Sequence, residues 1–255
     1  MKNFKSIKKP ILSKEVEKQL RKSINAGAFK PGDKLPSERE LVDQFQVSRV
    51  TIRDALKNLQ SFGLISIRRG LHAGAYVSEP TPQPITQSFE NLIQMGKVNF
   101  ANLIETRLYF EPNLSRSAAL LHTREDIENL CRLLDRAEEK LSKSRKEARL
   151  INVRFHCEVA KITRNYVNLF ICDSITQVFS ALIIEMTQKR LDKEAIRKLI
   201  SEHREIKNAI ASGDPLTAFE MTKKHLLETY YTYSKIMPEG YDEKTDRHIK
   251  SIAGL

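Results

Sequence analysis

The chain has few cysteines and lacks any long apolar run, and each absence excludes a class of protein. The three cysteines, Cys131, Cys157 and Cys172, are an odd number without CxxC spacing, which argues against a disulfide scaffold and a zinc ribbon. No stretch approaches the roughly 18 consecutive apolar residues of a membrane helix. The basic N-terminus lacks the apolar segment of a secretory signal. We therefore expect a cytoplasmic protein without a membrane partner.

Glycine and proline are also scarce, at nine each in 255 residues, which excludes collagen-like and low-complexity chains. Positive charge, in contrast, is abundant, with a formal net charge of +11. Residues 1–78 hold 16 Lys and Arg against 7 Asp and Glu, so a net charge of +9 lies there and +2 in the remainder. A compact basic segment is typical of proteins that bind a polyphosphate such as DNA, and a solubilising surface is the alternative.

Prolines divide the chain near residue 80. The segment SEPTPQPIT (78–86) has three prolines in nine residues, which can neither continue a helix nor fill a central strand. We expect a mainly α protein, with a domain over 1–78, a linker over 79–86, an all-α domain of about seven helices over 87–237, and a polar tail over 238–255.

The basic domain has the pattern of a winged helix-turn-helix. Apolar residues four apart predict a first helix from Leu12. Ser37 followed by Glu40 matches a capping box that begins a second helix, and Ser48 caps a third. Two short alternating segments, 64–68 and 75–77, then predict a β-hairpin joined by a flexible basic loop.

The third helix is the expected DNA reader, because in this motif the second of the paired helices enters the major groove with its N-terminus first. Arginine can hold guanine O6 and N7 with two hydrogen bonds, and hydroxyl groups suit phosphates. A glycine in the hairpin loop allows close approach to a minor groove. The candidate contacts are Arg39, Ser48, Arg49, Thr51, Arg53, Arg69 and Gly70. The alternative is that these are ordinary solvated side chains.

This domain resembles the DNA-binding domain of the GntR family of bacterial transcriptional regulators. The likeness rests on Pro31–Leu41, Val47–Leu56, Gly63–Ile65 and Arg68–Gly70, and covers about residues 10–78. It implies DNA contacts at the matching arginines, hydroxyl residues and loop glycine named above. Val50 departs from the pattern, since some members have a hydroxyl residue at that position.

The second domain carries helical patterns joined by short connections. The expected helices span 86–97, 100–121, 124–142, 146–164, 167–190, 193–212 and 215–236. Three histidines, His156, His203 and His225, come from three of them. Imidazoles from three helices can converge and bind zinc, nickel or manganese, although a lone helical histidine is more often an ordinary core or surface residue.

These helices resemble the FCD effector domain of FadR-like GntR regulators, on Asn152–His156, Thr163–Asn165, Glu202–Asp214 and Ala218–Leu226. The likeness implies an effector site whose divalent metal is held by four ligands, here Asn152, His156, His203 and His225. Asn152 stands where metal-binding members have Asp. A neutral ligand set leaves the ion its full charge, which favours an anionic effector such as a small organic acid.

Arg107 is the second candidate for the effector, and it matches the family's Arg-x-x-x-Glu. Its planar guanidinium suits a carboxylate. The alternative is an intrahelical pair with Glu111, four residues on.

Three functions remain open at this point. The first, which we expect, is a transcriptional regulator, such as a repressor, that binds a palindromic operator as a homodimer and responds to a small carboxylate. The second is a metal-dependent hydrolase or lyase acting on a small organic acid. The third is an architectural DNA binder without an effector. We do not expect an enzyme.

Overall fold

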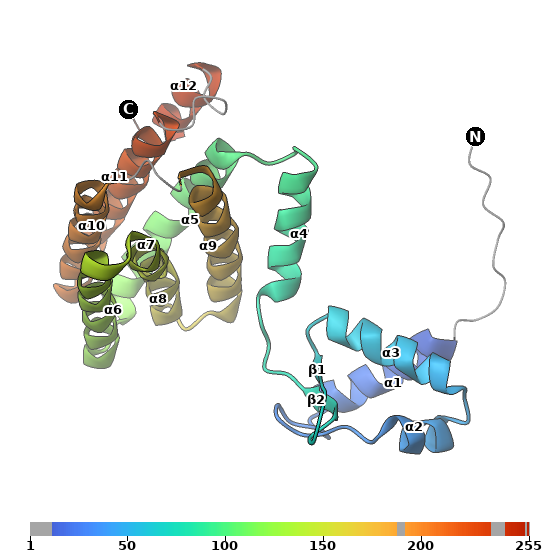
Figure 1. Ribbon diagram of the computed structural model, residues 1–255. Helices are drawn as coiled ribbons and strands as arrows, with labels where there is room; N and C mark the ends of the chain where they lie inside the picture. The colour runs from blue at the N-terminus through green and yellow to red at the C-terminus, as the bar shows by residue number, and fades with distance from the viewer. Residues whose placement is uncertain (1–11, 188–191, 236–242, 253, 255) are drawn as a thin grey trace, which may run out of the picture. The chain divides into compact units, whose positions relative to one another are not determined.

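The computed structural model describes residues 12–187, 192–235, 243–252 and 254, and the chain forms two compact units, 1–84 and 85–255 (Figure 1). The division lies within the segment expected to be the linker. Each unit has its own hydrophobic core.

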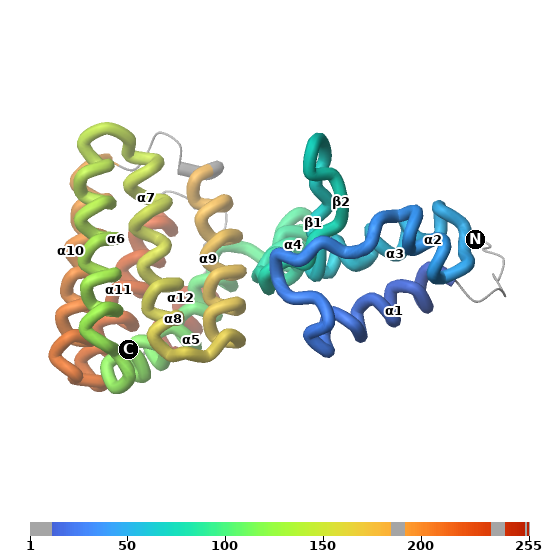
Figure 2. The backbone as a smooth tube through the Cα atoms, turned by 90° about the horizontal axis from the view of Figure 1, so that it is seen from below, coloured from blue at the N-terminus to red at the C-terminus, as the bar shows by residue number. Residues whose placement is uncertain are grey.

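The first unit is a winged helix-turn-helix, as the sequence predicts. Its elements are α1 (Leu12–Asn25), α2 (Glu38–Phe45), α3 (Arg49–Ser61), β1 (Ile65–Arg68) and β2 (Gly74–Val77). Helix α3 packs against α1, α2 and β1. The two strands pair antiparallel, from Ile65 opposite Val77 to Arg68 opposite Gly74. Figure 2 shows this hairpin projecting from the three helices.

Side-chain caps determine where the two reader helices begin. At α2, Ser37 and Glu40 each bind the other's backbone N–H, which is the predicted capping box. At α3, Ser48 Oγ accepts the N–H of Thr51 at 3.2 Å. Gln46 lies between them with a φ of +52°. This left-handed residue ends α2 and turns the chain into α3.

The described part of the second unit is helical throughout. Its elements are α4 (Gln83–Gln94), α5 (Phe100–Leu121), α6 (Arg124–Lys143), α7 (Arg145–Val153), α8 (Phe155–Ile162), α9 (Tyr166–Thr187), α10 (Lys193–Ala211), α11 (Pro215–Ser234) and α12 (Glu243–Ile252). Helix α5 is the centre of the bundle, since it packs against α8, α9, α10, α11 and α12. Helix α4 begins at Gln83, earlier than predicted, and Pro84 is tolerated because it lies in the first turn.

One expected helix is broken in two. The segment 146–164 divides at Arg154, whose N–H bonds to the carbonyl of Ile151 at 3.1 Å and so tightens the last turn of α7. Asn152 and His156 therefore lie on different helices, α7 and α8, rather than one turn apart on a single helix.

The C-terminal tail contains a helix that the sequence reading missed. Helix α12 lies within the tail expected over 238–255 and packs against α5. Ile249 is fully buried and Asp246 is 6% exposed. Two isoleucines in a strongly charged segment give little periodicity to detect, but Ile249 and Ile252 suffice to pack one side of a short helix on the core.

Among the described residues, one helical stretch, Tyr166–Ile184 in α9, is long and apolar enough to cross a membrane by length and composition. Cys172, Val178 and Phe179 of this stretch are buried in the core of the second unit. The core helix of a helical bundle passes the same test of length and composition.

Candidate functional site

The outer side of α3 presents the predicted DNA-binding residues to solvent. Arg49 and Arg53 are exposed, whereas Ile52 and Leu59 on the inner side are completely buried. Arg39 on α2 is also exposed. The apolar side of the reader helix is therefore used for packing, and its basic side is available to a ligand.

The first turn of α3 carries a pair of hydroxyl groups. Ser48 Oγ lies 2.8 Å from Thr51 Oγ1. Both hydroxyls lie at the N-terminus of the helix, where the dipole and the free backbone N–H groups favour an anion. This end of α3 is suited to a phosphate group.

Arg53 is tied to the preceding helix, which the sequence reading did not anticipate. Its Nε donates to both carboxylate oxygens of Glu38, at 2.9 and 3.2 Å, and the two side chains are 59% and 39% exposed. The pair joins the two helices of the reader.

The hairpin loop carries Arg69 and Gly70, both exposed. Gly70 has a φ of +86°, and a Cβ placed there would meet no atom within 4 Å. The loop therefore needs glycine for its backbone conformation and not because of crowding. The neighbouring Arg68 stacks on Tyr76, with its Cζ 4.2 Å from the ring centroid.

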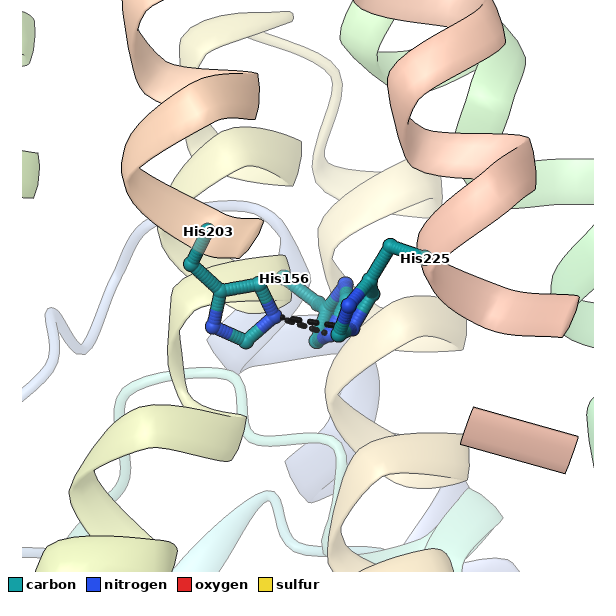
Figure 3. Close-up of side chains that lie close together, drawn as sticks. All are labelled: His156, His203 and His225. Atoms are coloured by element: carbon teal, nitrogen blue, oxygen red, sulfur yellow. Dashed lines mark hydrogen bonds between the residues drawn. The ribbon is translucent and has the colours of Figure 1, made fainter. Parts of the chain in front are cut away.

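In the second unit, three histidines from α8, α10 and α11 meet inside the bundle (Figure 3). His203 Nε2 lies 3.1 Å from His156 Nε2 and 3.0 Å from His225 Nε2. The three residues are between 1% and 5% exposed. The structure thus brings together the three predicted imidazoles.

Each imidazole is oriented by an oxygen atom on its other nitrogen. The Nδ1 atoms of His156 and His225 lie 2.7 Å from carboxylate oxygens of Glu111 and Glu202. The Nδ1 of His203 lies 2.9 Å from Asn152 Oδ1. Since ionised carboxylates and amide oxygens only accept, each neutral ring carries its proton on Nδ1. The three Nε2 lone pairs then converge, an arrangement that a cation would stabilise.

The electrostatics of this cluster keep Glu111 charged and His156 neutral. Burial raises the pKa of Glu111, but the positive charge of Arg107 and the contact with His156 outweigh it and lower the pKa to about 2. Burial lowers the pKa of His156 to about 4, although Glu111 raises it. Burial and the two neighbouring imidazoles hold the pKa of His203 well below 6.5. Neutral imidazole is the form that binds a metal.

The donor set fits a first-row divalent metal. The Nε2 atoms of His156 and His225 lie 3.1 and 3.0 Å from Nε2 of His203, and two metal–nitrogen bonds of about 2.0–2.1 Å would span such separations. Asn152 contacts the histidine cluster through His203, because its Oδ1 accepts a hydrogen bond from Nδ1 of that ring.

Arg107 is buried at 2% exposure and is paired with Glu111. Its Nε and Nη2 donate to the two carboxylate oxygens at 2.6 and 3.2 Å, and its Cζ lies 4.4 Å from the ring centroid of Phe179. The intrahelical pair considered from the sequence is therefore present. The same side chain also lines the cavity described next, so the pair does not remove it from the site.

Two hollows adjoin the histidines. A small central cavity of about 20 Å³ is lined by all three histidines, Asn152 and Arg107, with Val153, Phe179, Ile183, Leu199, Thr229 and Tyr233 completing its wall. A larger pocket of about 270 Å³ lies between α10 and α11 and is lined by Glu202 and His225. His225 thus faces both hollows.

Two family models match the chain. "Bacterial regulatory proteins, gntR family" matches residues 12–77, and "FCD domain" matches residues 102–228. The Uxu operon transcriptional regulator of Escherichia coli K12 is 30% identical over 252 residues, which cover 94% of this chain and 95% of that protein. The chain belongs to the GntR family. The Uxu operon regulator of Haemophilus influenzae is 30% identical, with 81% and 76% of the two chains covered.

A solved structure agrees on the fold. Streptococcus agalactiae GntR has a TM-score of 0.64 and 24% identity, with 85% of this chain and 98% of that one covered. This GntR-family chain is a DNA-binding transcriptional regulator with an FCD domain, and not an enzyme, because its relatives are named regulators. The hydrolase or lyase alternative is thereby dismissed.

Two residues of the histidine cluster were not predicted as part of it. Glu202 precedes His203 in the chain yet orients His225 on the neighbouring helix. Glu111 was considered only as the partner of Arg107, but it also orients His156. Sequence adjacency provided no usable signal, because Glu111 is far from His156 in the chain and Glu202 is next to His203 but bonds to His225.

Proposed function

We propose that this regulator binds a palindromic operator as a homodimer and responds to a small carboxylate through a divalent metal held by His156, His203 and His225. The convergence of the three Nε2 atoms, each ring fixed from behind by an oxygen, is the observation that carries the metal assignment. The metal would supply a positive centre with open coordination positions for an anion. A DNA-bound regulator of this kind acts in the cytoplasm.

The DNA-binding half of the proposal rests on the exposed side of α3. Its first turn enters the major groove, with Arg49 and Arg53 placed for base edges and with Ser48 and Thr51 for phosphate. Arg39, Arg69 and Gly70 add contacts from α2 and the hairpin loop. One chain has one such reader, and two half-sites one helical turn apart require two copies related by a two-fold axis.

The proposal that the effector is a carboxylate rests on the charge of the metal site. The cluster holds two carboxylates, Glu111 and Glu202, and one guanidinium, Arg107. A bound dication therefore makes the net charge of the site positive, which attracts an anion. The guanidinium Nη1 of Arg107 makes none of the hydrogen bonds found within the described residues and can donate to a carboxylate.

The metal assignment is tested by elemental analysis of the purified protein and by thermal unfolding with zinc, nickel or manganese. We expect about one ion per chain and a rise in melting temperature for wild type, with both lost in H203A. H122A is the matched control, because His122 is a partly buried histidine that bonds to the carbonyl of Ala119 outside the cluster. Metal-free wild type that gains no stability from any of the three ions would refute the assignment.

Two roles are open to Asn152 in the proposed metal site. The family likeness implies that it is a metal ligand, whereas the hydrogen bond to His203 makes it an orienting group. X-ray absorption of the zinc-loaded protein distinguishes these roles through the number of light ligands. If Asn152 is a ligand, N152D should place a negative charge on that ligand and tighten zinc binding. N152A should then reduce the number of light ligands around the zinc by one.

The regulatory half is tested with an operator selected from random duplexes. A small acid that occupies the metal centre should change operator affinity, and the operator should change acid affinity by the same factor. The dimer should appear as a two-fold symmetric footprint and as two chains per duplex in analytical ultracentrifugation. Binding of one chain to an asymmetric site would refute the dimer.

A further inference from the structure

One hydroxyl group on the wall of the central cavity has no hydrogen-bond partner among the residues that the structure describes. Thr229 lines this cavity together with Arg107 and the three histidines. Its side chain is buried, at 4% exposure, and its Oγ1 makes no hydrogen bond within the described residues. Buried polar atoms are nearly always paired, because losing water without a replacement is unfavourable. The position of this hydroxyl therefore needs an explanation.

Another threonine on the same helix shows the usual behaviour. Thr222 Oγ1 lies 2.9 Å from the carbonyl oxygen of Ala218, one turn back, and 2.7 Å from Ser115 Oγ. Helical threonines commonly form this bond to the preceding turn. Within the described residues, Thr229 forms no such bond to the carbonyl of His225. Its unpaired state is thus a property of this position and not of threonine in α11.

The wall of the central cavity contains both charged and neutral groups. The proposed metal and Arg107 are the cationic groups, and they match a carboxylate. The remaining wall includes Phe179, Ile183 and Leu199, which offer no hydrogen bonds. Thr229 follows His225 by one turn on the same side of α11. It provides a neutral hydroxyl, able to donate and to accept, beside the cationic groups.

We propose that Thr229 is a specificity-determining residue that binds a hydroxyl group of the effector, so that the effector is a hydroxy acid rather than a plain carboxylic acid. The proposal rests on the metal and acid binding proposed above. The metal and Arg107 bind the carboxylate of the effector. The neutral hydroxyl of Thr229 forms a hydrogen bond with the neutral hydroxyl of the effector.

The test compares T229V with T176V. Valine keeps nearly the shape of threonine and removes the hydroxyl. Thr176 on α9 is also 4% exposed with an Oγ1 that has no partner among the described residues, but it does not line the cavity. Zinc-loaded, full-length protein is titrated by calorimetry with acids that differ by their hydroxyl groups: malate and succinate, lactate and propionate, and gluconate and hexanoate.

We expect wild type and T176V to bind a hydroxy acid more tightly than its plain counterpart. T229V should lose about tenfold in affinity for the hydroxy acid, the order of one buried hydrogen bond, with no change for the plain acid or for zinc. T229S should retain the preference. Both valine variants should unfold at a higher temperature than wild type in the absence of acid, because each removes an unpaired buried hydroxyl.

Two results overturn the inference and a third overturns its basis. If T229V binds both acids of each pair as wild type does, or weakens both equally, Thr229 does not recognise the hydroxyl. If no acid binds wild-type protein that does hold zinc, the acid-binding function fails instead. T229A removes the same hydroxyl with a smaller side chain and replaces T229V if that variant does not fold.

Discussion

Replacing Glu111 by Gln should separate the effect of a buried ion pair from that of an exposed pair with the same spacing. Arg107 Nε lies 2.6 Å from Glu111 Oε1, and the two side chains are 2% and 4% exposed. Arg124 and Glu128 are also four residues apart on one helix, at 2.9 Å, with side chains 94% and 49% exposed. E111Q and E128Q therefore remove the same charge from two environments.

The expected loss for E111Q follows from the pKa of Glu111. Burial alone raises it, but Arg107 and His156 lower it from 4.5 to about 2. At about 1.36 kcal/mol per pKa unit, the surroundings favour the charged carboxylate by roughly 3 kcal/mol. Leaving the Arg107 charge buried without its partner has a cost of similar size, about 3–5 kcal/mol. At the exposed pair, E128Q should cost about 0.5 kcal/mol or less.

Urea unfolding of the full-length protein at pH 7, followed by far-ultraviolet circular dichroism, measures both losses. We expect E111Q to lower the free energy of unfolding by about 3 kcal/mol and E128Q to leave it almost unchanged. Because Glu111 also orients His156 at 2.7 Å, E111Q should weaken zinc binding by about 10–100-fold. Equal, small losses in the two variants would show that burial does not strengthen the first pair, and the reasoning would be wrong.

Three further predictions concern the reader helix and pH. R49A should weaken operator binding by about 1–3 kcal/mol and relax the preference at one base pair; the same discrimination among operator variants as wild type, at fixed salt, would rule out base reading. S48A should lower stability by about 1 kcal/mol through loss of the α3 N-cap, measured by thermal unfolding, while S61A, at the other end of α3, should have little effect. Burial raises the pKa of Asp126, but the hydrogen bond from Arg164 and the cap at Thr123 lower it below 3.8 overall. The ionised carboxylate therefore stabilises the fold at neutral pH, and this stabilisation is lost as the pH falls and Asp126 is protonated. The stability difference between wild type and D126N should therefore be present at pH 7 and shrink below about pH 4; a difference independent of pH would contradict this.

Local signals account for most of what the sequence predicted. The capping box at Ser37 and the cap at Ser48 set the starts of α2 and α3, because the atoms involved are three residues apart. The antiparallel hairpin followed from alternation in two short segments. The break at Arg154 was not predictable from periodicity, because the apolar pattern continues through it on both sides.

The histidine cluster was predicted by resemblance more than by spacing. His156, His203 and His225 lie on separate helices, so their convergence depends on how α8, α10 and α11 pack, which no local pattern specifies. The orienting carboxylates depend on the same packing. Glu202 lies beside His203 in sequence but bonds to His225, so adjacency in the chain would have paired it with the wrong ring.

The size of the central cavity determines how an acid could act on this regulator. About 20 Å³ holds an ion or one water molecule but not an organic acid. Its walls come from α5, α7, α8, α9, α10 and α11, so admitting an acid requires side chains such as Ile183 and Leu199 to move and these helices to repack. A metal that fits without movement would only stabilise the packed arrangement. An acid that binds only after repacking has a different affinity for the two arrangements, and that difference is what an effector needs in order to shift a conformational equilibrium.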